Sequence, residues 1–151
     1  MRLRTLSIVF AHLVLSLPLL AADTSRRGGA TVTIGSDQLE VSSWSFGVTQ
    51  TATAGGTGGG AGAGKVQMQD FHFVTRTGKS SATLFRACAT GQHFPEVTLV
   101  ARDAKGKDYY VVTLKDVLLS SFHTGGANND ELPTDQVSLN YASVEFQVLG
   151  L

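Results

Sequence analysis

The sequence predicts a mainly β protein, a small barrel or a sandwich, interrupted by one short helix. Apolar and polar residues alternate with a period of two along several segments, which is typical of strands. One segment instead spaces its apolar residues as a helix does. The length of 151 residues suits one domain and is too short for two ordinary ones. Closing the sheet into a barrel would also remove exposed strand edges.

The strand patterns fall into five clear segments and one shorter one. The clear segments are 39–50, 66–76, 97–101, 109–122 and 137–148, and the shorter one is 31–34. Turn residues at 35–37 and at 104–107 join neighbouring strands. In the last strand the apolar residues change parity between Tyr141 and Val144, which predicts a β-bulge near Ala142.

The helical segment begins near residue 80 and ends near residue 91. Ser80 or Ser81 is expected to cap its start, and Gly91 is placed to end it. Leu84 and Cys88 share one face of this helix. Cys88 is the only cysteine, so no internal disulfide can form. We interpret it as a small buried hydrophobic residue, with a reactive thiol or an intermolecular bridge as the alternative.

The first 22 residues have the features of a secretory signal peptide. Arg2 and Arg4 precede an apolar run at 6–20, and the small residues at 21–22 follow it. We expect cleavage after Ala22, which leaves residues 23–151 as a single domain in the periplasm or outside the cell. Removal of the two arginines changes the net charge from zero to 10 − 12 = −2. The alternative is an uncleaved anchor, although the apolar run is short for a stable membrane span.

Composition and motifs argue against several function classes. Twelve basic residues balance twelve acidic ones, so no positive field would attract nucleic acid. The motif G-x-x-x-x-G-K at 59–65 is followed by Val66, where a phosphate-binding loop needs Ser or Thr before a helix. His72, His93 and His123 lack metal-ligand spacing, although Asp70 precedes His72 on the same strand face. We therefore expect no enzyme activity, no cofactor and no metal.

A glycine-rich segment separates the first two clear strands. Seven of the ten residues at 55–64 are glycine, and the others are alanine and threonine. Glycine has no side chain with which to pack a core, so the segment is interpreted as a flexible loop.

A set of motifs, in order, extends this interpretation. The chain resembles the Hcp family, the hemolysin-coregulated tube proteins of type VI secretion, over about 110 residues from 39 to 148. The resemblance is carried by the following motifs: Trp44-Ser45-Phe46-Gly47, Gly64-Lys65, Asp70-Phe71, Ala87-Cys88-Ala89-Thr90-Gly91, Ser120-Ser121, Thr124-Gly125-Gly126 and Val137-Ser138-Leu139-Asn140.

The resemblance implies a small antiparallel β-barrel with one flanking helix. It also implies a homohexameric ring that stacks into a tube, without catalysis, in a Gram-negative bacterium. Such a tube acts as conduit and carrier, and its partners are its own copies, secreted effectors and tip or sheath proteins. The glycine-rich loop would then be the subunit-contact loop, formed by Ala54, Gly55, Gly56, Thr57, Gly58, Gly59, Gly60, Ala61, Gly62, Ala63 and Gly64.

Two features depart from the family pattern. Only residues 23–38 precede the strand at 39–50, so the sequence leaves open whether the barrel closes completely. A signal peptide is also unexpected in a tube subunit, which is assembled in the cytoplasm. The alternative is an exported ring-forming or surface-binding module that is detached from the secretion apparatus.

Overall fold

The computed structural model describes residues 28–50, 65–128 and 132–150. The expected signal peptide at 1–22 and the glycine-rich loop at 54–64 lie outside these residues. In the described part, eight strands and one helix follow one another along the chain. They are β1 (Gly29–Ile34), β2 (Asp37–Ser45), β3 (Val48–Gln50), β4 (Val66–Met68), β5 (Phe71–Arg76), α1 (Lys79–Thr90), β6 (His93–Arg102), β7 (Asp108–Gly125) and β8 (Thr134–Val148).

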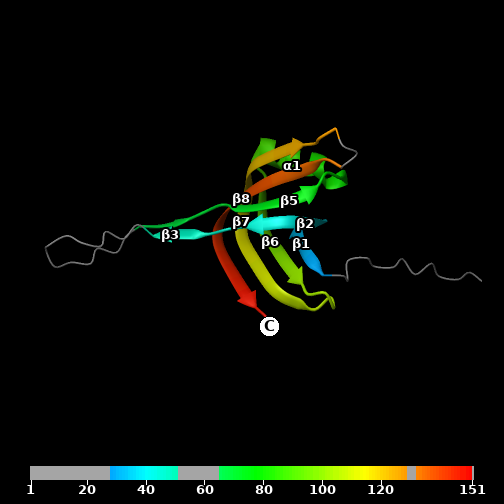
Figure 1. The fold of residues 1–151 in the computed structure, drawn as a ribbon. Helices are drawn as coiled ribbons and strands as arrows, with labels where there is room; N and C mark the ends of the chain where they lie inside the picture. The colour runs from blue at the N-terminus through cyan, green and yellow to red at the C-terminus, as the bar shows by residue number, and fades with distance from the viewer. Residues whose placement is uncertain (1–27, 51–64, 129–131, 151) are drawn as a thin grey trace, which may run out of the picture.

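Six of these strands form a closed antiparallel barrel in the order β1-β2-β5-β8-β7-β6 (Figure 1). The predicted mainly β fold with one helix is therefore confirmed, and of the two predicted architectures the barrel is the one present. The short N-terminal segment does not leave a gap. β1 pairs with β2 on one side and with β6 on the other, so its six residues complete the ring of strands.

Alternating side chains from the barrel strands fill its interior. Phe71 and Leu139 are completely buried and belong to the paired strands β5 and β8. Such inward-facing residues alternate with exposed ones because successive side chains of a strand point to opposite faces. The core consists of Val32, Ile34, Leu39, Phe71, Phe73, Leu84, Ala87, Phe94, Val97, Leu99, Val112, Leu114, Val117, Leu119, Val137 and Leu139.

The long hairpin of β7 and β8 changes its inward face near its middle. Leu114 pairs with Val144 and Val117 pairs with Tyr141, so both strands change parity at the same level. The predicted change of phase in β8 is confirmed, but the register does not shift at Ala142. Asp116, which lies opposite Ala142, has a φ of 49°. β7 changes its inward face at Asp116 and β8 changes its inward face at Ala142, so the register between the two strands is kept. The bulge that shifts the register of this pair is at Ser120.

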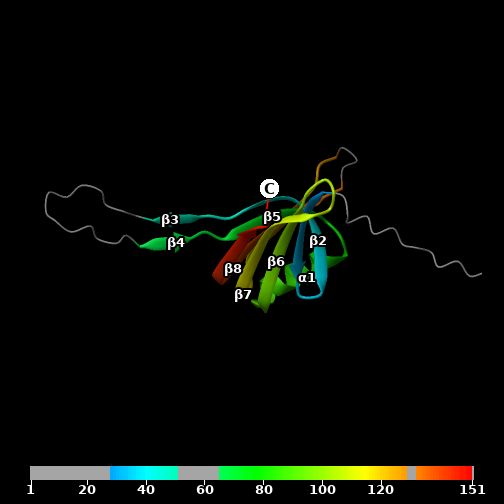
Figure 2. The ribbon, with the colours of Figure 1, turned by 90° about the horizontal axis from the view of Figure 1, so that it is seen from below.

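The predicted strands at 39–50 and 66–76 are each interrupted. Their outer parts, β3 and β4, pair only with each other and project from the barrel (Figures 1 and 2). We call these two strands the arm. The residues that join the arm to the barrel, 46–47 on one side and 69–70 on the other, together with Phe71 at the start of β5, form its root. Because three residues stand opposite two, the root contains a bulge.

The helix α1 packs its inner face against the barrel, with Leu84 and Ala87 buried. Gly91 ends it in the left-handed conformation, with a φ of 64°, as predicted. The predicted cap was wrong, because the N-cap is Gly78. Ser81 is the third helical residue, and its hydroxyl accepts a hydrogen bond from the Gly78 N–H at 2.8 Å. Such a hydroxyl close to a helix start resembles a cap in sequence.

Candidate functional site at the arm and its root

The arm exposes apolar side chains. All six of its residues are exposed, and Val48, Val66 and Met68 retain 61%, 54% and 52% of their accessible surface. Val48 stands opposite Met68 in the ladder, and Val66 lies two residues before Met68. These three side chains therefore share one face of the arm.

An aromatic cluster lies where the root meets the barrel. Trp44 stacks on Tyr110 with ring centroids 5.1 Å apart, and Phe46 stacks on the buried Phe71 at 5.9 Å. Phe146 contacts the rings of Phe46 and Tyr110 at 6.0 Å in each case, yet 57% of its surface is exposed. Stacked rings of this kind hold each other at fixed angles.

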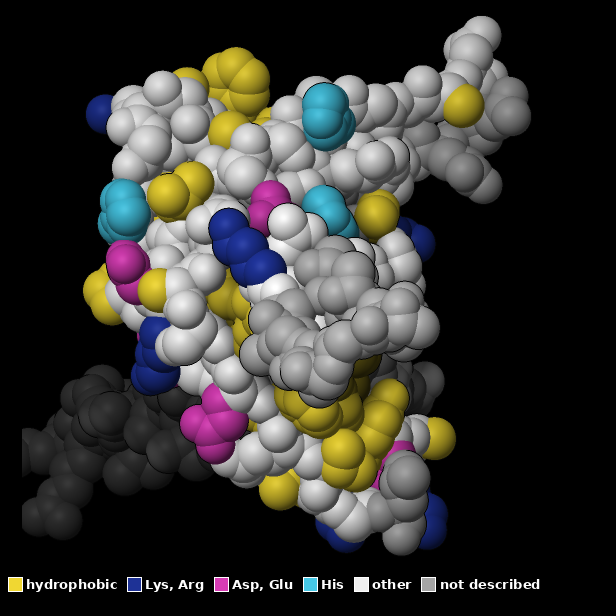
Figure 3. Space-filling model, turned by 90° about the vertical axis from the view of Figure 1, so that its left-hand side faces the viewer, with side chains coloured by type: hydrophobic (Ala, Val, Ile, Leu, Met, Phe, Trp, Pro, Cys, Tyr) yellow, Lys and Arg dark blue, Asp and Glu magenta, His cyan; other side chains and the backbone are white. Residues whose placement is uncertain are grey.

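The outer edge of this cluster is an apolar surface. Figure 3 views the side from which the arm projects, and hydrophobic side chains gather in the lower half of that face. The C-terminal part of β8 and the residue after it contribute exposed side chains of Phe146, Val148 and Leu149. Together with the arm, they give the molecule two exposed apolar regions close to the root.

A polar cluster lies at the same root. The Asp70 carboxylate accepts hydrogen bonds from the Ser120 hydroxyl at 2.5 Å and from the Asn140 side-chain amide at 3.0 Å. The Tyr141 hydroxyl donates to the carbonyl oxygen of Gln69 at 2.9 Å. Partial burial, and secondarily the negative charge of Asp70, raise the pKa of Tyr141 above its usual value. The sequence motifs contained Asp70, Ser120 and Asn140 but did not indicate that they meet.

The three histidines that sequence analysis weighed as ligands are not brought together. The Nδ1 atom of His72 lies 2.7 Å from the Ser138 hydroxyl, which itself accepts a hydrogen bond from Ser121 at 2.8 Å. His93 pairs with Asp116 at 3.0 Å on the exposed surface. Across the part of the chain that the structure describes, no group of three metal-ligating side chains occurs. Lys65 precedes the strand β4, whereas a phosphate-binding loop would lead into a helix.

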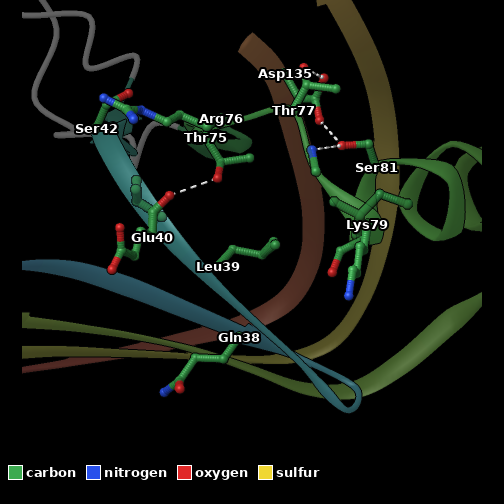
Figure 4. A pocket seen from close by; sticks show the side chains of 14 residues that line it. Gln38, Leu39, Glu40, Ser42, Thr75, Arg76, Thr77, Lys79, Ser81 and Asp135 are labelled. Atoms are coloured by element: carbon green, nitrogen blue, oxygen red, sulfur yellow. Dashed lines mark hydrogen bonds between the residues drawn. The ribbon is translucent and has the colours of Figure 1, made fainter. Parts of the chain in front are cut away.

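A second polar cluster, which sequence analysis missed, fixes the start of α1. The carboxylate of Asp135 is completely buried and accepts hydrogen bonds from Thr77, at 2.7 Å, and from Ser81. It borders an open pocket of about 620 Å³ between β2 and the start of α1 (Figure 4). On the other side of this pocket, the Thr75 hydroxyl donates to the Glu40 carbonyl at 2.7 Å. These bonds are internal to the fold and indicate a structural role.

Residues 54–64, which the sequence analysis expects to be a subunit-contact loop, lie outside the described residues, and the arm is the described part of the chain that precedes and follows them. Cys88 packs against the core, but it is half-buried and not fully buried as predicted. Within the described ranges, the helix is too short and too polar to cross a membrane.

Comparison with known proteins gives consistent results. A family model described as "Type VI secretion system effector, Hcp" matches residues 22–148. The "Protein hcp1" of Pseudomonas aeruginosa is 40% identical over 84 residues, which are 54% of this chain and 52% of that protein. The chain thus matches about half the length of this curated relative.

Solved structures share the fold. The crystal structure of Hcp1 from Salmonella typhimurium superposes with a TM-score of 0.67 at 24% identity, over 81% of this chain and 87% of that one. A type six secretion system protein superposes with a TM-score of 0.72 at 19% identity, over 79% and 82% of the two chains. A chain of the sheath-tube complex of an extracellular contractile injection system gives 0.61 at 14% identity, over 80% and 89%. Because the family model covers residues 22–148, which is most of the sequence, the chain belongs to the Hcp family of type VI secretion.

Proposed function

We propose that this protein is a structural subunit that forms six-membered rings, which stack into a tube serving as conduit and effector carrier. The observation that carries the proposal is the arm. It leaves the closed barrel with Val48, Val66 and Met68 exposed on one face. A lone two-stranded ladder is marginally stable in water, so the arm needs a partner surface.

A second copy of the chain provides such a surface. Phe146, Val148 and Leu149 are exposed beside the root, and apolar patches of this kind mark sites of protein association. An arm that docks on a different surface of the next subunit makes a head-to-tail contact. Repetition of this contact closes a ring when the rotation from each subunit to the next adds up to a full turn. We further propose that the loop at 54–64 extends the arm and contacts neighbouring subunits or rings.

The channel of such an assembly lies between subunits. The barrel interior is filled by large side chains such as Phe71 and Leu139, which are completely buried, and leaves no path through a single subunit. Effectors would therefore be carried in the central hole of the ring, and tip or sheath proteins would contact its rims. Residues 23–151 form the assembling domain in this proposal, and they perform no catalysis.

The predicted signal peptide favours a second candidate function. The sequence at 1–22 favours cleavage after Ala22 and transfer across the inner membrane. The protein would then be an exported ring-forming or surface-binding module that works apart from the secretion apparatus. N-terminal sequencing of the exported protein tests this cleavage. If the exported protein still begins at Met1, the cleavage is refuted and an uncleaved anchor takes its place. Neighbouring genes for sheath and baseplate parts would favour the tube over the module.

Mass photometry of residues 23–151 tests the assembly. We expect rings of six, and weaker association between subunits or rings, without loss of the fold, after deletion of residues 54–64. Val66→Thr and Met68→Thr together should also weaken association, whereas Thr49→Ser and Gln67→Ser, on the opposite face of the arm, should not. A protein that stays monomeric at all accessible concentrations would refute the tube, and unfolding after the deletion would show that the loop packs on the barrel.

A further inference from the structure

Two irregularities in the strands lie next to each other at the root of the arm. The first is the bulge of the root, where residues 69–71 stand opposite residues 46–47. The second is the bulge of β7 at Ser120, where the register with β8 shifts by one residue. Bulges bend a strand and change the direction in which it continues. The first bulge lies where the arm leaves the barrel, and the second contacts it through the hydrogen bond between Ser120 and Asp70.

Asp70 connects the two bulges. It belongs to the first bulge, and one of its carboxylate oxygens accepts a hydrogen bond from the hydroxyl of Ser120 in the second. Its other oxygen accepts from the amide of Asn140. Phe71 pairs with Leu139 in the antiparallel ladder of β5 and β8, so position 70 is the next place along β5 and faces position 140. The side chains thus continue the ladder beyond the last backbone pair.

Beside the ring contacts of Phe46 with Phe71 and Phe146, the other hydrogen bonds of the root each act at a single point. The Gln69 N–H donates to the Gly47 carbonyl at 2.9 Å, which joins the two sides of the root to each other. The Tyr141 hydroxyl holds the Gln69 carbonyl at one point on the barrel. A single point of attachment permits rotation, whereas the two oxygens of Asp70 bind two different strands, β7 and β8.

We propose that Asp70 is a positioning residue that locks the direction of the arm relative to the barrel by joining these two bulges. The lock itself is a property of one subunit. Its consequence, an arm held ready to meet the next subunit, rests on the proposed function. An arm with a fixed direction loses less conformational freedom on docking than one that swings.

The direction of the arm can be measured within a single chain. Spin labels are placed at Gln67→Cys on the arm and at Gln136→Cys on the exposed face of β8, with Cys88→Ala to remove the natural thiol. The doubly labelled protein, residues 23–151, is diluted into excess unlabelled protein. Pulsed electron paramagnetic resonance then reports distances between the two labels within one subunit. Asp70→Ala is compared with Asp108→Ala, which also removes a surface carboxylate but lies away from the root, beside Arg102.

We expect Asp70→Ala to make the distance distribution roughly twofold broader, because the arm then samples several directions. Asp108→Ala should leave the distribution unchanged. A second variant, Ser120→Ala with Asn140→Ala, removes both donors from exposed positions and should broaden the distribution similarly. It decides the question if circular dichroism shows that Asp70→Ala does not fold. An unchanged distribution in the folded variants would overturn the proposal.

Mass photometry of the same variants separates this proposal from the proposed function. If the parent protein forms no rings, the tube proposal fails, but the width of the distribution still tests the lock. If rings form normally and the distribution stays narrow in the variants, the lock alone fails. If both proposals hold, the variants should form rings at higher protein concentrations than the parent does.

Discussion

Asp135→Ala should destabilise the fold more than other single changes of a charged residue. The Asp135 side chain is completely buried and accepts two hydrogen bonds, from Thr77 and Ser81, so it attaches the start of α1 to β8. Hydrogen bonds to a charged group contribute about 1.5–3 kcal/mol each, and the donors left behind lose their acceptor. Alanine also removes the desolvation penalty of a buried charge, which offsets part of this loss.

We therefore expect the free energy of unfolding to fall by about 3 kcal/mol. In a domain of this size, 1 kcal/mol corresponds to about 3 °C, so the melting temperature should fall by about 9 °C. Asp135→Asn keeps the shape and one acceptor, and should cost about half as much. Glu145→Ala, an exposed change in the same strand, should stay within about 0.5 kcal/mol of the parent.

Urea unfolding followed by circular dichroism and by the fluorescence of the single tryptophan measures these differences. The two signals should shift together if the domain unfolds in one step. The reasoning would be refuted if Asp135→Ala lost no more stability than Glu145→Ala. An Asp135→Asn variant as unstable as Asp135→Ala would show that one remaining acceptor does not hold the start of the helix.

Three further predictions concern single residues. Gly91→Ala should lower the free energy of unfolding by about 1 kcal/mol, because alanine tolerates the left-handed φ poorly, and thermal unfolding measures this. Cys88 should react slowly with an alkylating reagent in the native protein and quickly in urea, and equal rates would indicate an exposed thiol. The pKa of Tyr141 is raised, so the folded protein should lose stability as the pH rises above the pKa of an unfolded tyrosine. Ultraviolet titration should show that Tyr141→Phe removes a phenol that ionises above the usual pH range of tyrosine. Loss of a phenol that ionises within or below that range would contradict this prediction.

The barrel could be predicted because its signal is local. Each strand has its own alternation of apolar and polar residues, and Gly91 marks the end of the helix because glycine readily adopts a positive φ. The interruptions at the root could not be predicted in this way. Trp44, Phe46 and Val48 keep the same parity across the break, so the pattern reads as one strand. What ends β2 is the bulge of the root, where the pairing with the segment 66–76 shifts by one residue, and the alternation of side chains in the sequence does not show this shift.

The polar clusters were missed for a related reason. Asp135 bonds to Thr77 and Ser81, which lie 58 and 54 residues away in the sequence. Asp70 bonds to Asn140 across 70 residues. A single aspartate near a strand end is usually solvated, so its sequence context favours an exposed position. Only the closure of the barrel brings the donors to these carboxylates.

The matched change of face in β7 and β8 limits how relatives of this chain can vary. Asp116 and Ala142 lie opposite each other, and each moves its own strand from one parity to the other. Deleting one residue from one strand alone would turn half of that strand inside out against an unaltered partner. Viable insertions and deletions here should therefore come in compensating pairs. A chimera of two relatives should take both strands of this hairpin from the same parent.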